Sequence, residues 1–242
     1  MDPADLIAVG IAVFFAASVQ AVSGFGFALL SVPLMTLAIP TKDAVVVSTI
    51  VGLVITVFQA YQLRADTQRP LAKRCIIGAY LGMPFGLILF IYLDDDVLRL
   101  MLGISVLAAV GLLLLRYPRA DVPVAFDYGA GFVSGVLNTS LSTNGPPLAF
   151  SLSARRLQPD AFRATINTIF AFSAVVSLSM FLLAGKVTSD GLVAAAIAMP
   201  SMLLGQIAGT PLRRHVQGER FRWLTIGLMV LAGTSAIYFA LA

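Results

Sequence analysis

The sequence contains few of the residues that build disulfides, metal sites or a soluble surface. It has one cysteine, Cys75, and one histidine, His215, so an internal disulfide and a cluster of metal-binding cysteines or histidines are excluded. Charged residues make up 12% of the 242 residues, whereas a soluble domain has about a quarter. With 59% hydrophobic residues and a mean hydropathy of +0.93, the composition indicates a protein that crosses a membrane several times.

Charge is missing above all from the interiors of the apolar runs, which contain no Asp, Glu, Lys, Arg or His. Hydrolysis inside a membrane requires a nucleophile with a base or a metal set, so we expect no enzyme, no metal and no cofactor. Proton-driven carriers commonly keep an ionisable residue in the membrane, and these runs offer none. The net charge of +4 comes from basic residues in short loops, where they report topology and not a nucleic-acid partner.

Eight apolar runs without a charged residue follow one another along the chain. They are Leu6–Ile39, Ala44–Leu63, Cys75–Leu93, Leu100–Leu115, Tyr128–Ala154, Ala164–Gly185, Gly191–Leu212 and Trp223–Ala242. A spanning helix needs about 20 residues, and six runs have about this length. The first and the fifth are too long for one crossing and short for two, so we expect each to form a membrane-inserted helical hairpin. The N-terminus lacks the basic residues of a signal peptide, so the first run is expected to stay in the mature protein.

The loops between the runs predict the topology through the positive-inside rule. The basic loops at 64–74 and 155–163 are predicted to be cytoplasmic, and the acidic loop at 94–96 to be outside. The fifth run then leaves the cytoplasmic side and returns to it, and the first run does the same from the outside. We therefore predict an all-α polytopic fold of two inverted repeats, each a membrane-inserted hairpin followed by three transmembrane helices.

The two halves of the chain also share residue identities at a fixed offset of 119 positions. Gly10, Ser23, Gly26, Leu29, Pro40, Thr49 and Ile50 match Gly129, Ser142, Gly145, Leu148, Pro159, Thr168 and Ile169. Inverted repeats with interrupted helices at corresponding places are typical of transporters. We expect one transmembrane domain, residues 1–242, in which repeat one covers about 1–120 and repeat two about 121–242.

Each expected hairpin contains a break that suits a binding site. The stretch Asn138–Leu148 combines hydroxyl and amide side chains with a glycine and two prolines, and the turn of the first hairpin falls near Ser23–Gly26. Prolines prevent a regular helix and bare backbone cannot face lipid, so such a stretch lies within protein or lines a cavity. Arms of about 17 residues would each be about 25 Å long and would bring the two tips together near the midplane.

The tips offer neutral groups that suit an anion. The first N–H groups of the returning arms, Phe27–Leu30 and Pro147–Phe150, have no intrahelical partner and carry partial positive charge. Glycines let the backbone approach a ligand closely, and hydroxyl and amide side chains donate hydrogen bonds. The candidate substrate-binding residues are Gln20, Ser23, Gly24, Phe25, Gly26, Ser48, Thr49, Asn138, Ser142, Thr143, Asn144, Gly145, Pro146 and Asn167.

Some of these residues also have a structural interpretation. Ser and Thr in membrane helices often bond to their own turn or to a neighbouring helix, and for Ser48 and Thr49 the two interpretations weigh about equally. A polar group buried in lipid without a role is costly, which favours a function for Asn138, Asn144 and Asn167.

Two further groups are interpreted mainly as structural. Arg155, Arg156 and Arg163 could attract anions to the cytoplasmic mouth, but we interpret them first as topology signals. The glycines of the segment Gly78–Gly86, and Gly103, are interpreted as sites of helix packing.

The segments around the two tips are the most distinctive motifs in the chain. They are Ser23–Pro33 (SGFGFALLSVP) and Gly135–Leu148 (GVLNTSLSTNGPPL). Together with the repeat length, the helix start at Pro40–Ala44 and the glycine-rich helix at Gly78–Gly86, they resemble the sulfite exporter TauE/SafE family over essentially the whole chain. The resemblance implies a multi-pass permease of the bacterial inner membrane for sulfite, sulfonates or related small sulfur-containing anions. Family members usually have more glycines at the tips, so we expect a pocket of different shape here.

Three functions compete for this sequence. The favoured one is a secondary transporter that binds a small oxyanion between the tips, because the interior-negative potential favours anion exit by about 2.3 kcal/mol per charge per 100 mV. An ion-coupled importer of another small organic anion stays open, since backbone carbonyls can hold sodium. A non-transporting accessory protein is less favoured because a scaffold has no need of interrupted helices. The expected partners are a small anionic substrate and the lipid bilayer, and a homodimer is left open.

Overall fold

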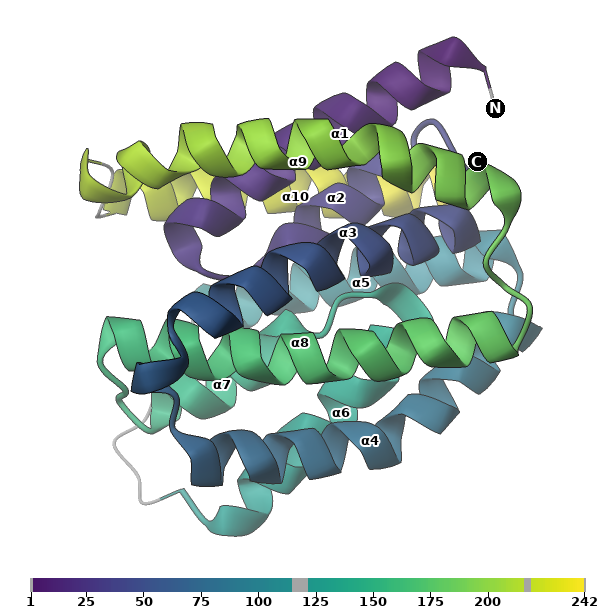
Figure 1. The fold of residues 1–242 in the computed structure, drawn as a ribbon. Coiled ribbons are helices and arrows are strands. Elements are labelled where there is room, and N and C mark those ends of the chain that lie inside the picture. Colours follow the sequence, from purple (N-terminus) through teal and green to yellow (C-terminus); the bar gives the residue numbers. More distant parts are fainter. Residues whose placement is uncertain (1, 115–121, 216–218, 242) are drawn as a thin grey trace.

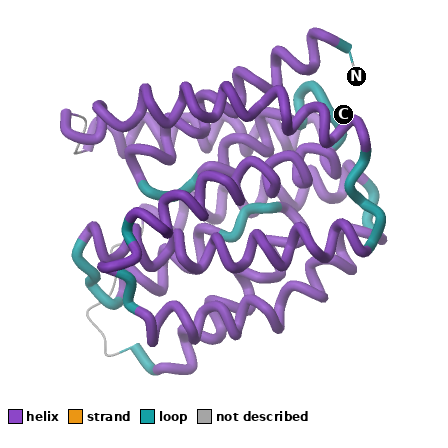
Figure 2. The backbone as a smooth tube through the Cα atoms, in the orientation of Figure 1, coloured by secondary structure: helices purple, strands orange, loops and turns teal. Residues whose placement is uncertain are grey.

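The computed structural model describes residues 2–114, 122–215 and 219–241, and within these ranges the chain is helical and contains no strand (Figures 1 and 2). The helices are α1 (Pro3–Ser23), α2 (Phe27–Met35), α3 (Thr41–Gln62), the short 3₁₀ turn η1 (Arg64–Asp66), α4 (Arg69–Tyr92), α5 (Asp95–Leu114), α6 (Val124–Leu141), α7 (Gly145–Ala154), α8 (Pro159–Leu183), α9 (Ser189–His215) and α10 (Glu219–Leu241). The prediction of an all-α protein is confirmed.

Five of the described helices are long and apolar enough to cross a membrane. They are α1, α3, α4, α8 and the part of α9 at Ser189–Pro211. Their outer faces carry large apolar side chains, and Phe58, Leu81 and Leu203 are each more than half exposed. Such a surface suits hydrocarbon and not water, so the prediction of a multi-pass membrane protein is confirmed.

Most connections between the helices gather at two ends of the bundle (Figure 2). At one end Thr188 Oγ1 donates a hydrogen bond to the Asp43 carboxylate over 3.1 Å. At the other end the main-chain N–H of Gln68 donates to Thr165 Oγ1 over 3.0 Å. The second end carries the basic residues of 64–74 and 155–163, so the positive-inside rule predicts that it is the cytoplasmic end, and it is given that name below.

The helix pairs α1–α2 and α6–α7 are hairpins whose connecting loops lie inside the bundle instead of at its ends (Figure 2). The first hairpin opens toward the outer end and the second toward the cytoplasmic end (Figure 1). The breaks at 24–26 and 142–144 fall within the segments where the sequence predicted them.

The prediction of two arms of about 17 residues was wrong for the first hairpin. Helix α1 has 21 residues and α2 has 9, while α6 has 18 and α7 has 10. One reason is that α1 starts before the apolar run, at Pro3, where the Asp2 side chain caps it in a capping box with Asp5. The break then follows at Gly24, so the returning arm is the short one in each hairpin.

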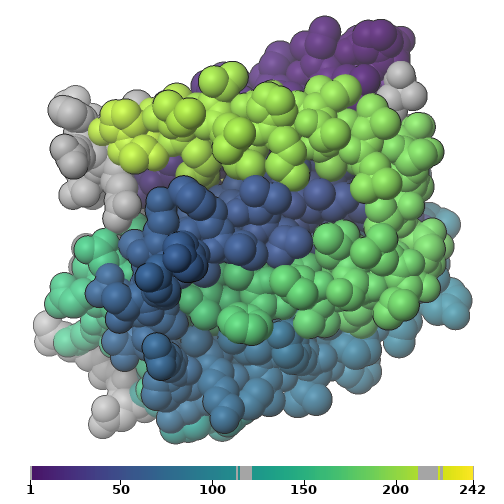
Figure 3. Space-filling model, in the orientation of Figure 1, coloured from purple at the N-terminus to yellow at the C-terminus, as the bar shows by residue number. Residues whose placement is uncertain are grey.

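Glycines allow the closest helix contacts in the molecule. A Cβ atom added to Gly78, Gly82 or Gly86 of α4 would overlap a carbonyl oxygen of α6, and one added to Gly135 of α6 would overlap the Ala79 oxygen of α4. This agrees with the interpretation of these glycines as packing residues. Helix α9 packs in the same way on α1, and α3 and α8 lie side by side in the middle of the molecule (Figures 1 and 3).

Candidate functional site

The tip of the first hairpin is shaped by two glycines in the left-handed region. Gly24 has φ 84° and Gly26 has φ 97°, conformations that residues with a Cβ rarely adopt. The Gly24 N–H donates to the Gln20 carbonyl over 2.7 Å and so ends α1. The Ser23 hydroxyl donates within the same loop, with its oxygen 2.6 Å from the Phe25 carbonyl oxygen. The chain then turns back and enters α2 at Phe27.

The tip of the second hairpin uses a different local structure. Ser142 ends α6 in the left-handed conformation, φ 59°, and its N–H donates to the Asn138 carbonyl over 2.9 Å. The Ser134 hydroxyl donates to the Asn144 carbonyl over 2.9 Å and holds the loop against α6. Helix α7 starts at Gly145 with prolines in its first turn, a position where the missing N–H breaks no intrahelical bond.

Both tips line one small cavity, named here the central cavity, which also touches α3 and α8. Its volume is about 50 Å³. The sequence-predicted site residues that line it are Gln20, Gly26, Ser48, Thr49, Asn138, Ser142, Thr143, Asn144 and Gly145. It lies level with the middle of α3, where Gly52 contributes to the wall.

One hydrogen bond joins the second tip to α3 at this cavity. The Thr49 hydroxyl donates to the Val45 carbonyl over 2.8 Å, and its oxygen lies 3.2 Å from Ser142 Oγ. Because the Thr49 proton is already used, Ser142 is the donor of the second bond. Ser48 lies 3.2 Å from Ser31 of α2 through the two hydroxyl oxygens. Both interpretations of Ser48 and Thr49 therefore hold at once: they bond within the protein and line the cavity.

The remaining predicted site residues lie elsewhere. Ser23 and Pro146 do not line the central cavity, and Phe25 packs edge-on against Phe162, with ring centroids 6.1 Å apart. Gly24 and Asn167 line a second space of about 440 Å³ on the cytoplasmic side of the first tip, named here the side cavity. There the Asn167 amide donates to the Gly24 carbonyl over 3.1 Å.

Two buried polar atoms at the central cavity have no protein partner within the described part of the chain. They are Oε1 of Gln20 and Oγ1 of Thr143, on side chains that are each 1% exposed. A buried polar atom without a hydrogen bond costs about 1–3 kcal/mol. Both residues also line the cavity, so a ligand or water there can supply the missing bond.

The two returning helices differ as sources of N–H groups. Helix α2 begins with Phe27, Ala28 and Leu29, whose N–H groups lack intrahelical partners, and all three residues line the cavity. Helix α7 begins with Gly145 followed by Pro146 and Pro147, which have no N–H. The prolines take two N–H donors from the first turn of α7 and leave that of Gly145, so α2 offers more free amides at the cavity than α7 does.

The described residues that line the central cavity include no charged side chain. A water needs about 10–15 Å³ of such space, so a volume of about 50 Å³ holds a few waters or one small oxyanion. Phe27, Leu29 and Phe170 supply apolar wall beside the amides and hydroxyls. The geometry suits a small solute with an anionic head and at most a short apolar part.

Sequence reasoning missed part of this wall, namely Gly52 and Thr56 on α3 and Phe170 and Ala174 on α8. These residues lie three to eight positions beyond Ser48, Thr49 and Asn167, which is the spacing of one helix face. Extending the polar residues along that face would have found them.

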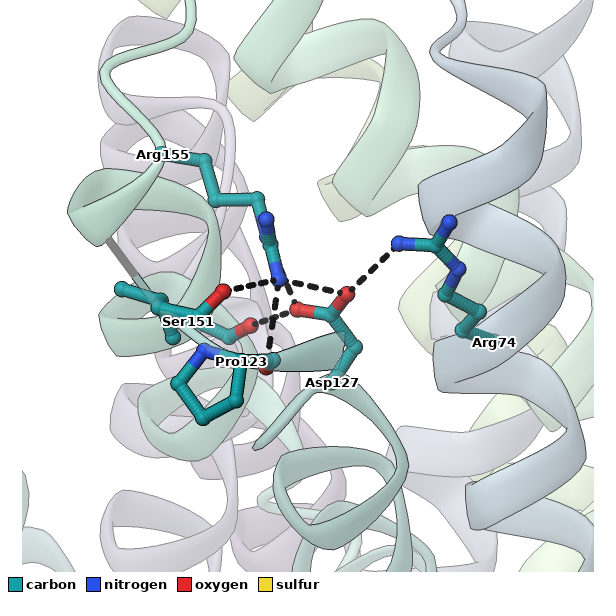
Figure 4. Close-up of polar contacts among 6 residues, drawn as sticks. Arg74, Pro123, Asp127, Ser151 and Arg155 are labelled. Carbon is teal, nitrogen blue, oxygen red and sulfur yellow. Dashed lines mark hydrogen bonds and ion pairs between the residues drawn. The ribbon is translucent and has the colours of Figure 1, made fainter. Parts of the chain in front are cut away.

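The sequence also gave no signal for a buried ion network at the base of the second hairpin (Figure 4). The Asp127 side chain is 0% exposed, and Arg155 Nε and Nη2 donate to its two oxygens over 3.0 and 2.9 Å. Arg74 Nη1 of α4 adds a bond of 3.3 Å, and the Ser151 hydroxyl of α7 one of 3.1 Å. Arg155 therefore does more than report topology, because it ties the carboxylate to both arms of the hairpin.

Comparison with known proteins agrees with this architecture. The sulfite exporter TauE/SafE family matches residues 9–236. A protein of Cupriavidus necator named "Probable sulfite/organosulfonate exporter TauE" is 26% identical, over 89% of this chain and 87% of that protein. No solved structure matches the chain. The chain belongs to the sulfite exporter TauE/SafE family, and it is a multi-pass transporter of the bacterial inner membrane and not an enzyme.

Proposed function

We propose that this protein carries a small sulfur-containing oxyanion, sulfite or a short organosulfonate, across the membrane. The observation that carries the proposal is the central cavity, an uncharged space lined by the interrupted tips of two hairpins that open at opposite ends. The substrate class follows from the Cupriavidus necator relative, whose name specifies sulfite and organosulfonates.

The start of α2 is the proposed anion-binding element. Its free N–H groups carry partial positive charge and suit oxyanion oxygens without a charged side chain. Thr143 has a hydroxyl with no partner in the described chain, which can donate to an oxyanion oxygen, whereas the unpaired Gln20 Oε1 is an acceptor that a water can satisfy. Asn138, Asn144 and Ser142 complete the polar lining, and Phe170 takes the apolar part of a sulfonate.

Packing between the helices supports an inverted pair of repeats within one domain. The contact of α4 with α6 has its counterpart in the contact of α9 with α1, while α3 with α8 and α5 with α10 pair equivalent helices of the two halves. In such a transporter the site stays near the midplane while one repeat moves against the other. A single chain supplies the whole lining of the cavity, so this proposal does not need the homodimer that the sequence left open.

Export is the proposed direction. An anion that leaves a cell with a negative interior gains about 2.3 kcal/mol per charge per 100 mV. This electrical term needs no titratable residue at the cavity, which agrees with its uncharged lining.

The proposal is tested by flux of labelled sulfite and ethanesulfonate through proteoliposomes containing wild type or Thr143→Val. Thr143 Oγ1 has no partner in the described protein, so its loss leaves the free energy of unfolding unchanged or slightly higher. We expect flux to fall about tenfold, equivalent to about 1.4 kcal/mol.

The matched control is Thr234→Val, because Thr234 is exposed on α10 and bonds only to its own turn. Its flux should equal that of wild type. Wild-type vesicles that move neither anion would refute the substrate class, and normal flux through Thr143→Val would refute the site.

A further inference from the structure

The side cavity, about 440 Å³ in volume, borders the first tip, and the proposed function does not use it. Its walls come from α1, α3, α8 and α9, in the cytoplasmic half of the molecule. Two of these helices, α3 and α9, run side by side across the face shown in Figure 3. Arg163 is the charged residue among its described lining residues, and the amides of Gln59, Asn167 and Gln206 also line it.

The turn of the first hairpin borders both the side cavity and the central cavity. Gly24 lines the side cavity and Gly26, two residues further, lines the central cavity. Both glycines have positive φ, so this short piece of backbone has conformational freedom that other residues lack. A displacement of the turn would join the two spaces.

Two side chains of α8 hold the turn from the side cavity. Arg163 Nη2 donates to the Val22 carbonyl over 3.2 Å, and Asn167 Nδ2 donates to the Gly24 carbonyl over 3.1 Å. The Arg163 stem packs so closely on Gly24 that an added Cβ would lie 2.6 Å from its Cγ. These carbonyls belong to the C-terminal end of α1, whose partial negative charge attracts a guanidinium group.

The partners of Arg163 can be exchanged. A guanidinium group has five N–H donors, and its hydrogen bonds to an oxyanion are roughly twice as strong as those between neutral groups. Arg163 Nη1 also pairs with the exposed Asp160 carboxylate at 3.7 Å, whereas Nη2 bonds to the neutral Val22 carbonyl, so an anion in the side cavity competes best at Nη2. The Arg163 side chain is 16% exposed, so it is shielded from water on most sides but reachable from the cavity.

The side cavity also contains hydrogen-bond acceptors that receive no hydrogen bond from the described chain. Within the described chain, Oδ1 of Asn167 and Oε1 of Gln59 are buried and have no partner. Their amide orientations are fixed: Asn167 Nδ2 donates to two carbonyls, and Gln59 Nε2 donates to Gln206 Oε1 over 3.3 Å. A ligand with a hydroxyl group beside its anionic group would satisfy the acceptors and the arginine together.

We propose that the side cavity is a second binding site, for a small hydroxyl-bearing oxyanion, in which the anion takes the place of the Val22 carbonyl on Arg163. Binding there loosens the α8 contacts of the first tip and opens the way from the cytoplasm to the central cavity. The role as an entry site rests on the proposed function, whereas binding at Arg163 does not.

The first test counts bound 2-hydroxyethanesulfonate per chain in phosphatidylcholine nanodiscs. We expect two sites in wild type, one in Arg163→Gln, and two in Arg156→Gln, a matched control in which an exposed arginine of the loop before α8 loses its charge. Equal stoichiometry in Arg163→Gln and wild type would overturn the proposal. So would a second site that disappears on addition of phosphatidylglycerol, since Arg163 would then hold a lipid headgroup.

The same measurement separates this inference from the proposed function. Thr143→Val should weaken the central site and leave the Arg163-dependent site intact. If Thr143→Val has no effect while Arg163→Gln removes one site, the central site fails and the side site stands. If Thr143→Val abolishes all binding, the side site fails.

The second test reports opening of the tip through a thiol in the central cavity. In a Cys75→Ser background, Ala28→Cys places one cysteine on the cavity wall, and a thiol reagent is added from the cytoplasmic side. We expect 2-hydroxyethanesulfonate to raise the labelling rate severalfold. When Asn167→Ala is combined with these substitutions, the labelling rate should be equally high without the anion. Rates unaffected by both the anion and Asn167→Ala would contradict opening at this turn.

Discussion

The two hairpins are anchored by different interactions. The second is joined to α4 by direct backbone contact at Gly82 and Gly135 and by the buried Asp127 carboxylate with its two arginines. The first hairpin also has direct backbone contact, where α1 meets α9 at Gly205 and Gly209, but its tip is held by hydrogen bonds from Arg163 and Asn167 to main-chain carbonyls. Charge pairs buried among close-packed helices resist displacement, whereas single bonds to carbonyls exchange readily. The comparison indicates that the second hairpin is fixed at its base by a buried ion network, whereas the tip of the first hairpin is adjustable.

The largest effect on the anchoring of a hairpin is expected from the substitution Asp127→Asn. It leaves Arg74 and Arg155 without their buried counter-charge, and we expect a loss of about 3–5 kcal/mol in the free energy of unfolding. Denaturant unfolding in detergent measures the loss. Asp66→Asn, at an exposed position, should stay within about 0.5 kcal/mol of wild type. Similar values for the two variants would show that the network does not fix the hairpin.

The next largest effect is expected from Gly82→Ala. The new methyl group overlaps the Phe132 carbonyl oxygen and forces α4 and α6 apart, at a cost of about 1–3 kcal/mol. Gly129→Ala on the same α6 helix meets nothing within 4 Å, and it should stabilise the protein by about 0.5–1 kcal/mol. The same unfolding experiment compares them. A destabilisation shared by both would point to a general intolerance of alanine and not to helix contact.

The substitution Gly24→Ala tests whether the contact between the first tip and Arg163 contributes to stability. Alanine at φ 84° costs about 1–2 kcal/mol in backbone strain, and the methyl group also displaces the Arg163 side chain. Gly26→Ala, at φ 97° with open space around it, carries the strain alone. We expect the larger loss of unfolding free energy in Gly24→Ala. Equal losses would mean that contact with Arg163 adds nothing.

The smallest loss of unfolding free energy is expected from substitutions of two threonines at matching positions in the two halves of the chain. Thr49→Val and Thr168→Val each remove one intrahelical hydroxyl bond and should cost about 0.5–1 kcal/mol. Only Thr49 lies at the central cavity, where Ser142 donates to it, whereas Thr168 bonds to Thr67. Sulfite flux in proteoliposomes should therefore fall severalfold for Thr49→Val alone. Equal flux in the two variants would argue against a role for Thr49 in the site.

The sequence predicted the parts of this molecule that depend on local chemistry. Clustered glycines and paired prolines disfavour a continuous helix through local backbone chemistry alone, so the breaks at Ser23–Gly26 and within Asn138–Leu148 were predictable. Hydropathy predicted membrane-spanning helices because it also depends on local composition, and five of the described helices are long and apolar enough to cross a membrane. The family was also identified from these motifs, and the match to the TauE/SafE family confirms it.

The parts that the sequence did not predict depend on distant contacts. Asp127 meets Arg74 and Arg155 only after α4, α6 and α7 have packed, so no local pattern marks it as buried. Asn167 was expected at the central cavity, but the rotation of α8 turns it toward Gly24 and the side cavity. Whether the residues gathered at the central cavity bind substrate stays a prediction until flux is measured.

The paired prolines at the start of α7 have a consequence for how a bound solute would leave. Since Pro146 and Pro147 contribute no amide hydrogens, most of the helix-end amide hydrogens at the central cavity belong to α2, which starts at the adjustable tip. Any shift of that tip moves these hydrogens away from the opposite wall of the cavity. The same movement that opens the cavity therefore also weakens the hydrogen bonds to the solute. Unbinding and exposure would then be a single event.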